Sequence, residues 1–239
     1  AIYDPKGGGL GGGGGGVRGG GGRAPGCVSP RAGTPPRPTL PDGQAPLLVH
    51  TGSIAAILAP GAATVEQVLR ETRATSTIAY DPNARPQLMG EPEEAREVVE
   101  RLVGLSDLVK CSDEDIAWLY GEGADLETVL RSWLEKGAAI VVVTRGKQGA
   151  LALSASGVRL EVPADPSVVV ADTVGAGDSF MGGLEDALWS EDLVGADRRE
   201  ALRAVDAATL ERIVRHAAAI ADITVSRAGA NPPTRDELP

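Results

Sequence analysis

The residues best suited to chemistry lie in one short glycine-containing segment, residues 172–178. Gly175 and Gly177 carry no Cβ, so the backbone around them can approach an anion closely. A strand that turns into a helix here would present several backbone N–H groups, with the positive end of the helix dipole behind them. Asp178 at the helix start could take the proton of an attacking hydroxyl. The segment predicts an anion cradle, although Gly-x-Gly loops are common and an Asp at this place is also typical of a simple N-cap.

Two other glycine motifs are excluded by the surrounding residues. A dinucleotide fingerprint needs Gly where Phe180 stands, and no Gly-Lys-Ser/Thr follows a glycine at P-loop spacing. The nine residues Asp-Thr-Val-Gly-Ala-Gly-Asp-Ser-Phe, 172–180, instead resemble the carboxy-terminal signature of the ribokinase-like, or PfkB, family of carbohydrate kinases. Glu185 departs from that signature, which has a small or apolar residue at its place.

The resemblance assigns a role to each residue of the segment. In the family, the backbone amides of the Gly-Ala-Gly run form an anion hole for the transferring phosphoryl group, and the last Asp is the catalytic base. These roles fall on Gly175, Ala176, Gly177 and Asp178. Two further positions of the motif help to hold an activating monovalent cation such as K⁺, and they are Asp172 and Val174.

Three earlier segments resemble family elements in the same order along the chain. Residues 81–85, Asp-Pro-Asn-Ala-Arg, are similar to an element of the fructokinase branch that lies near substrate, which implies Asn83 and Arg85 as substrate contacts. Residues 110–115 resemble an element whose polar pair meets phosphate and magnesium-bound water, although this pair is also a plain capping box. Residues 144–149 resemble the family's nucleotide loop, for which a bare turn is the alternative. The nucleotide-binding residues that these two segments imply are Ser112, Asp115, Thr144, Gly146 and Gly149.

The C-terminal part adds two more candidates for nucleotide binding. The helix that contains His216 and the Arg-Ala-Gly-Ala run that contains Gly229 resemble the family's segments around the adenine and the cation. His216 could stack on the base, or it could be an ordinary histidine of the core or surface.

The elements that must position these residues follow a strand–helix alternation from residue 46 onward. Strands are predicted at residues 47–50, 76–81, 107–110 and 139–144, the last a β-branched run expected of a parallel strand covered on both faces. A hairpin is expected at 151–162, and Val168–Val170 leads into the glycine loop. Helices are predicted at 92–103, 210–224, after the glycine loop, and from Thr64, Ser112 and Asp125. This pattern predicts an α/β fold, a ribokinase-like mostly parallel sheet flanked by helices.

Residues 1–45 differ in composition from the rest. They are rich in Gly, Pro and Arg, and such a segment cannot bury enough apolar surface to offset its ordering entropy, so we expect it to be disordered. Alternatively it is a basic tail for an anionic partner, or an aberrant, out-of-frame translation of a GC-rich gene. The family's Gly-Gly-x-x-Asn sugar element and its β-lid have no counterpart here. The kinase domain is therefore predicted at 46–239, with the lid absent or incomplete.

Composition limits the partners. The net charge of −10 opposes binding to nucleic acid or to an anionic membrane surface, and no long apolar run or secretory signal occurs, which predicts a cytoplasmic protein. The two cysteines, Cys27 and Cys111, indicate neither a disulfide framework nor a zinc site. The resemblance implies a carbohydrate kinase that uses ATP, Mg²⁺ and K⁺ on a sugar, most similar to bacterial fructokinase. A catalytically crippled nucleotide-binding remnant and a nucleoside or other small-alcohol kinase are the alternatives, and a homodimer is left open.

Overall fold

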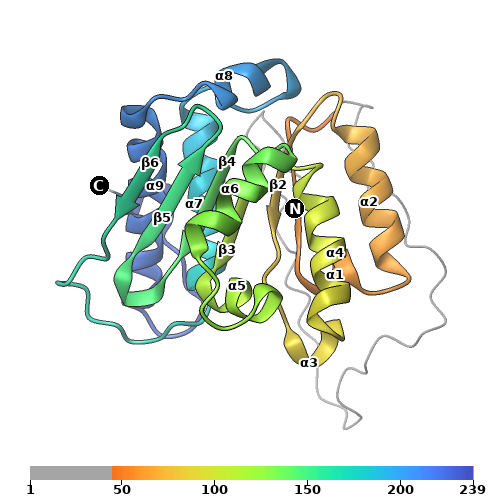
Figure 1. The fold of residues 1–239 in the computed structure, drawn as a ribbon. Coiled ribbons are helices and arrows are strands. Elements are labelled where there is room, and N and C mark those ends of the chain that lie inside the picture. The colour runs from red at the N-terminus through yellow and green to blue at the C-terminus, as the bar shows by residue number, and fades with distance from the viewer. Residues whose placement is uncertain (1–44, 239) are drawn as a thin grey trace, which may run out of the picture.

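The computed structural model describes residues 45–238, and their strands form one six-stranded sheet in the order β1 to β6 (Figure 1). Neighbours among β1 to β4 pair in parallel, whereas β5 and β6 add to one edge in antiparallel fashion. The predicted mostly parallel sheet with an edge hairpin is thereby confirmed. The strands are β1 Leu48–Gly52, β2 Thr77–Asp81, β3 Leu108–Ser112, β4 Ile140–Thr144, β5 Ala150–Ser154 and β6 Arg159–Val162. The segment predicted to be disordered, 1–45, lies outside the described residues except for Ala45.

Helices cover both faces of the sheet (Figure 1). Helices α7, α8 and α9 pack on one face, and α2, α4, α5 and α6 contribute to a second apolar cluster on the other. The α-helices are α1 Ser53–Ile57, α2 Gly61–Thr72, α3 Pro86–Met89, α4 Pro92–Val103, α5 Asp113–Tyr120, α6 Leu126–Lys136, α7 Ala176–Ser190, α8 Arg199–Arg203 and α9 Ala207–Val225, and the 3₁₀ turns are η2 Gly146–Gln148, η3 Ala196–Arg198 and η4 Arg235–Glu237.

Strand β4 lies at the centre of this three-layer arrangement. Its residues Ile140 and Val142 point to the α7 and α9 side, whereas Val141 and Val143 point to the opposite cluster, and all four are fully buried. Burial on both faces is the reason that the strand shows no polar alternation. The neighbouring Cys111 on β3 is a free cysteine and is fully buried, as a small apolar residue would be.

Two local predictions are wrong. The segment that leads into the glycine loop is not a strand: Val169 is 81% exposed, and the backbone amides of Ala171 and Asp172 donate to the carbonyl oxygen of Val225 at the end of α9. Residues 168–170 pair with none of the six strands of the sheet. Helix α2 begins at Gly61 rather than at Thr64, because the preceding turn is already helical.

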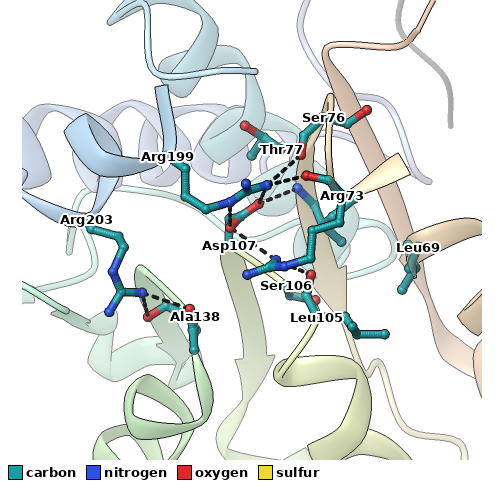
Figure 2. Close-up of polar contacts among 12 residues, drawn as sticks. Leu69, Arg73, Ser76, Thr77, Leu105, Ser106, Asp107, Ala138, Arg199 and Arg203 are labelled. Carbon is teal, nitrogen blue, oxygen red and sulfur yellow. Dashed lines mark hydrogen bonds and ion pairs between the residues drawn. The ribbon is translucent and has the colours of Figure 1, made fainter. Parts of the chain in front are cut away.

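A buried carboxylate anchors the α8 region to the amino ends of the strands (Figure 2). Asp107, 1% exposed, accepts from Arg199 Nε at 2.7 Å and from the amide of Ile78 at 2.9 Å, and Arg73 Nη1 lies 3.3 Å away. Arg199 Nη2 also donates to the carbonyl oxygens of Arg73 and Ser76. The cluster fixes the connection between α7 and α9 at the end of the sheet opposite to α3 and α5 (Figure 1).

Candidate active site

The candidate site lies where the carboxyl ends of β1 to β4 meet the amino end of α7. Because parallel strands end at a common edge, residues far apart in sequence converge there. Gly52 of β1 pairs with Asp81 of β2, and Ser112 of β3 pairs with Thr144 of β4. A Cβ on Gly52 would lie 2.1 Å from the carbonyl oxygen of Asp81, so this close approach requires glycine.

The amino end of α7 presents unpaired backbone donors. Gly175 precedes the helix with φ 80°, a left-handed conformation that favours glycine. The amide of Ala176 donates to the carbonyl oxygen of Thr173 at 3.2 Å. Within residues 45–238, the amides of Gly175, Gly177 and Asp178 have no acceptor. Three N–H groups at a helix amino end form the kind of cradle that binds phosphate.

The Asp178 carboxylate is exposed and lies next to the turn that follows β2. Asn83 Nδ2 is 3.4 Å from Asp178 Oδ1. Arg85 Nη1 donates to Asn83 Oδ1 at 2.6 Å, and Ser53 Oγ donates to the Asn83 carbonyl oxygen at 3.1 Å. The structure therefore brings together Asp178 and the two predicted substrate residues.

An ion pair that sequence reasoning did not include among the site residues lies beneath this turn. Lys110 Nζ on β3 is 2.9 Å from Asp81 Oδ2 on β2, and both side chains are 4% exposed. Burial raises the pKa of Asp81, and the nearby ammonium of Lys110 opposes that rise. The other carboxylate oxygen of Asp81 accepts from the amide of Asn83. A lysine in the apolar run 108–111 was the available signal, because a fully buried lysine needs a partner.

Ser112 and Asp115 form the predicted capping box at the start of α5. The amide of Asp115 donates to Ser112 Oγ at 3.0 Å, and Asp115 Oδ2 accepts from the amide of Ser112 at 2.8 Å. Asp115 Oδ1 accepts from the amide of Ala84 at 2.8 Å, which ties α5 to the turn after β2. Asp115 thus holds the turn that carries Asn83, besides capping its own helix.

The predicted nucleotide loop follows β4 directly. Thr144 Oγ1 donates to the carbonyl oxygen of Cys111 at 3.3 Å, beside Ser112. Gly146 begins the turn η2 with φ 51°, and no atom lies within 4 Å of the position of a Cβ. A Cβ on Gly149 would lie 2.0 Å from the carbonyl oxygen of Val162, so this turn packs tightly on the end of β6.

Asp172 joins the glycine loop to the C-terminal loop. Its Oδ1 accepts from the amide of Val174 at 3.0 Å, and its Oδ2 accepts from the amide of Gly229 at 2.9 Å. These two hydrogen bonds hold the pKa of Asp172 below its ordinary value. A Cβ on Gly175 would lie 2.8 Å from the Cβ of Ala230, so the two loops are in close contact.

His216 is not brought into this cluster. Its Nε2 lies 2.8 Å from Asp186 Oδ2, and Arg235 Nη2 contacts the other oxygen of the same carboxylate. Asp186 is eight residues after Asp178 on α7, which places it about 12 Å further along the helix. Stacking of His216 on a base stays a prediction.

A pocket of about 410 Å³ opens beside Gly175 and Asp178, between α7, α9 and the C-terminal segment. Its apolar wall includes Ile220, Pro232 and Leu238. This volume is in the range of small-molecule sites, and it gives a ligand access to the Asp178 carboxylate.

The described residues provide few ligands for a metal ion. No group of three or more His, Cys, Asp or Glu side chains in residues 45–238 could hold one. Mg²⁺ usually keeps several waters and binds through one or two carboxylates together with substrate phosphates, so Asp115 fits a contact through water better than direct coordination. In the part of the chain that the structure describes, no helix is long and apolar enough to span a bilayer.

The family of this chain follows from comparison with known proteins. The model of the pfkB family carbohydrate kinases matches residues 43–237, which is most of the chain, and the chain belongs to this family. Two curated relatives are the fructokinase of Rhizobium leguminosarum bv. trifolii, 36% identical over 146 residues, and that of Klebsiella pneumoniae, 34% identical over 146 residues. Each alignment covers 61% of this chain, and the chain spans about half of the relatives' length, 44% and 47% respectively.

Comparison with solved structures agrees with this family assignment. The fructokinase from Xylella fastidiosa with bound ATP matches with a TM-score of 0.68 and 26% identity, over 77% of this chain and 57% of that one. A fructokinase double mutant from Vibrio cholerae O395, in a fructose-, ADP- and potassium-bound form, matches with a TM-score of 0.61 and 29% identity, over 77% and 55%. The ribokinase-like fold expected from the glycine segment is confirmed.

Proposed function

We propose that the chain carries the phosphoryl-transfer site of an ATP-dependent sugar kinase, with fructose as the acceptor. The observation that carries this proposal is the set of three unpaired amides at the start of α7 beside the Asp178 carboxylate. Phosphoryl transfer requires positioning and stabilisation of charge more than covalent chemistry, and such an arrangement supplies both.

The roles of the residues follow from their places. The amides of Gly175, Gly177 and Asp178 bind the oxygens of the transferring phosphoryl group. The Asp178 carboxylate accepts the proton of the attacking hydroxyl, while Asn83 orients that carboxylate from 3.4 Å. The resemblance also assigned the Ala176 amide to the anion hole. Because this amide already donates to the carbonyl oxygen of Thr173, it contributes less to the binding of phosphoryl oxygens.

Nucleotide and ions have candidate partners around this centre. ATP lies along the strand ends, with Thr144, Gly146 and Gly149 beside its phosphates or ribose. Ser112 and Asp115 would contact phosphate and the waters bound to Mg²⁺. When bound, Mg²⁺ lowers the charge repulsion between the phosphates. Asp172, Val174 and Gly229 would hold a K⁺ ion, and the potassium-bound Vibrio cholerae enzyme supports this choice of ion.

Two other functions stay open. One is a remnant that binds nucleotide without turnover, and the assay below distinguishes it from an active kinase. An aminoimidazole riboside kinase from Salmonella enterica, with a TM-score of 0.58 and 25% identity, supports a nucleoside kinase.

The test is a coupled assay of ADP formation with fructose, other sugars and nucleosides. Asp178→Asn should lower kcat by a factor of about 100 or more, the usual contribution of a general base. Asp113→Asn, at the partly exposed start of α5, is the matched control and should leave kcat unchanged. Full turnover by Asp178→Asn would exclude Asp178 as the base. Nucleotide binding without turnover of any acceptor would favour the remnant.

A further inference from the structure

Two residues with unusual backbone angles meet beside the Asp178 carboxylate. Among residues 45–238, the non-glycine residues with positive φ are Ser53 at 55°, Asn83 at 40° and Asp192 at 57°. Asn and Asp are enriched in this left-handed conformation, whereas serine has no such preference. Strained residues of this kind persist only where the surrounding structure fixes them, and they cluster at active sites.

The close approach of β1 and β2 accounts for the conformation of Ser53. Strand β1 ends at Gly52, opposite Asp81 of β2, and a Cβ on Gly52 would lie 2.1 Å from the Asp81 carbonyl oxygen. The amide of Ser53 donates to the carbonyl oxygen of Pro82 at 3.2 Å. The chain that leaves β1 is thus held against the turn that follows β2, with Ser53 in the left-handed conformation.

The side chain of Ser53 adds a second contact to the same turn. Ser53 Oγ donates to the Asn83 carbonyl oxygen at 3.1 Å. Arg85 Nη1 donates to this oxygen at 3.0 Å, but Arg85 is exposed and lies only two residues after Asn83. The hydroxyl of the half-buried Ser53 comes from a different strand end, so it ties the Asn83 carbonyl to β1.

The backbone of Asn83 decides where its side chain points. The amide of Asn83 donates to Asp81 Oδ1 at 3.1 Å, so the peptide groups on both sides of its Cα are held. With the backbone fixed in this way, Asn83 Nδ2 lies 3.4 Å from Asp178 Oδ1. A misplacement of about 1 Å near the reacting atoms can lower a rate by a factor of about 100, so this constraint is large enough to affect turnover.

We propose that Ser53 is a positioning residue for phosphoryl transfer, which holds Asn83 so that its side-chain amide meets the Asp178 carboxylate. The inference rests on the proposed function and adds to it a residue that acts through another one. Holding the turn in this place requires a left-handed Ser53, which lowers the stability of the fold.

The test separates the hydroxyl from the backbone strain by replacing Ser53 with Ala and with Gly. Both variants lose the hydrogen bond to Asn83, but only glycine adopts a φ of 55° without strain. Each should lower kcat/KM for the acceptor by about tenfold, with KM for ATP within about twofold of wild type. The Tm of Ser53→Gly should nevertheless exceed that of Ser53→Ala by about 2–4 °C.

Ser132→Ala is the matched control. Ser132 is also half-buried and donates to a backbone carbonyl, that of Val129 in α6, at 2.7 Å. This variant should change neither kcat/KM for the acceptor nor KM for ATP.

A second comparison uses Asn83→Gly, which removes the side chain at a φ that glycine accepts. Because Ser53 acts through Asn83, Ser53→Gly in this background should lower kcat/KM by less than about twofold more. Losses that multiply fully in the double variant would overturn the proposal.

The other outcomes are equally decisive. Wild-type kcat/KM in Ser53→Gly, with a loss in Ser53→Ala, would show that strain alone matters and would overturn the proposal. Wild-type kcat/KM in both variants, or a parallel rise in KM for ATP, would do the same. The sugar kinase function stands in each of these cases, because the wild type turns over its acceptor. A wild-type chain that turns over no acceptor would overturn both.

Discussion

Replacement of Asp107 by Asn tests how the amino ends of the strands are held. The carboxylate is 1% exposed and accepts from Arg199, Arg73 and the Ile78 amide (Figure 2). Asn keeps the shape of the Asp107 side chain, but its NH₂ group replaces one carboxylate oxygen. An acceptor thus becomes a donor that faces the N–H donors around it. Removing one partner of a buried ion pair costs about 3–5 kcal/mol. We expect about 3 kcal/mol, because the side chains of Arg199 and Arg73, 22% and 28% exposed, regain some water.

For a domain of this size a loss of 3 kcal/mol lowers Tm by about 6–12 °C. Urea unfolding followed by circular dichroism measures the free energy, and scanning calorimetry measures Tm. Asp192→Asn is the control: Asp192 also pairs with an arginine, Arg198 at 2.7 Å, but its side chain is 75% exposed. It should cost no more than about 0.5 kcal/mol. The reasoning is refuted if the two variants lose the same stability, or if Asp107→Asn stays within about 0.5 kcal/mol of wild type.

Two further outcomes are expected. Gly149→Ala should lower the free energy of unfolding by about 1–3 kcal/mol more than Gly90→Ala, because the backbone angles are similar (φ 85° and ψ −138° against φ 78° and ψ −144°) but only Gly149 has an atom in the way. Equal urea midpoints would show that the turn relaxes freely. Asp172 has a folded pKa below the ordinary 3.8, so it stabilises the folded state above that pH and loses this contribution as the pH falls through the lowered pKa. Wild type should therefore exceed Asp172→Asn in stability at pH 6, with the difference shrinking below pH 3.8; a constant difference would contradict the assigned hydrogen bonds.

Sequence patterns predicted correctly those helices and caps that depend on neighbouring residues alone. The helix predicted at 92–103 coincides with α4, because Pro92 at its first position and the apolar spacing act within one element. The caps Ser112 and Asp125 are found as predicted, since each side chain bonds an amide three residues on. Thr64 has the same local pattern but lies inside α2, because the helix extends back to Gly61.

Contacts between segments far apart in the sequence could not be predicted from local sequence patterns. Val168–Val170 has the composition of a strand, yet the amides that follow it bond to the end of α9, more than fifty residues later. The resemblance places His216 near the nucleotide, which stays a prediction, but it gave no sign that Asp186 contacts both His216 and Arg235.

The sequence alone determined the family and led to the proposed chemistry, because the Gly-Ala-Gly-Asp run and the buried β-branched strand are continuous in the chain. Tertiary structure decided which residues meet. The pairing of β2 with β3 sets Asp81 beside Lys110, and α7 packs so that Gly177 abuts that lysine. The spacing of these residues along the chain does not predict such contacts, since the contacts depend on strand register and on helix packing across the sheet.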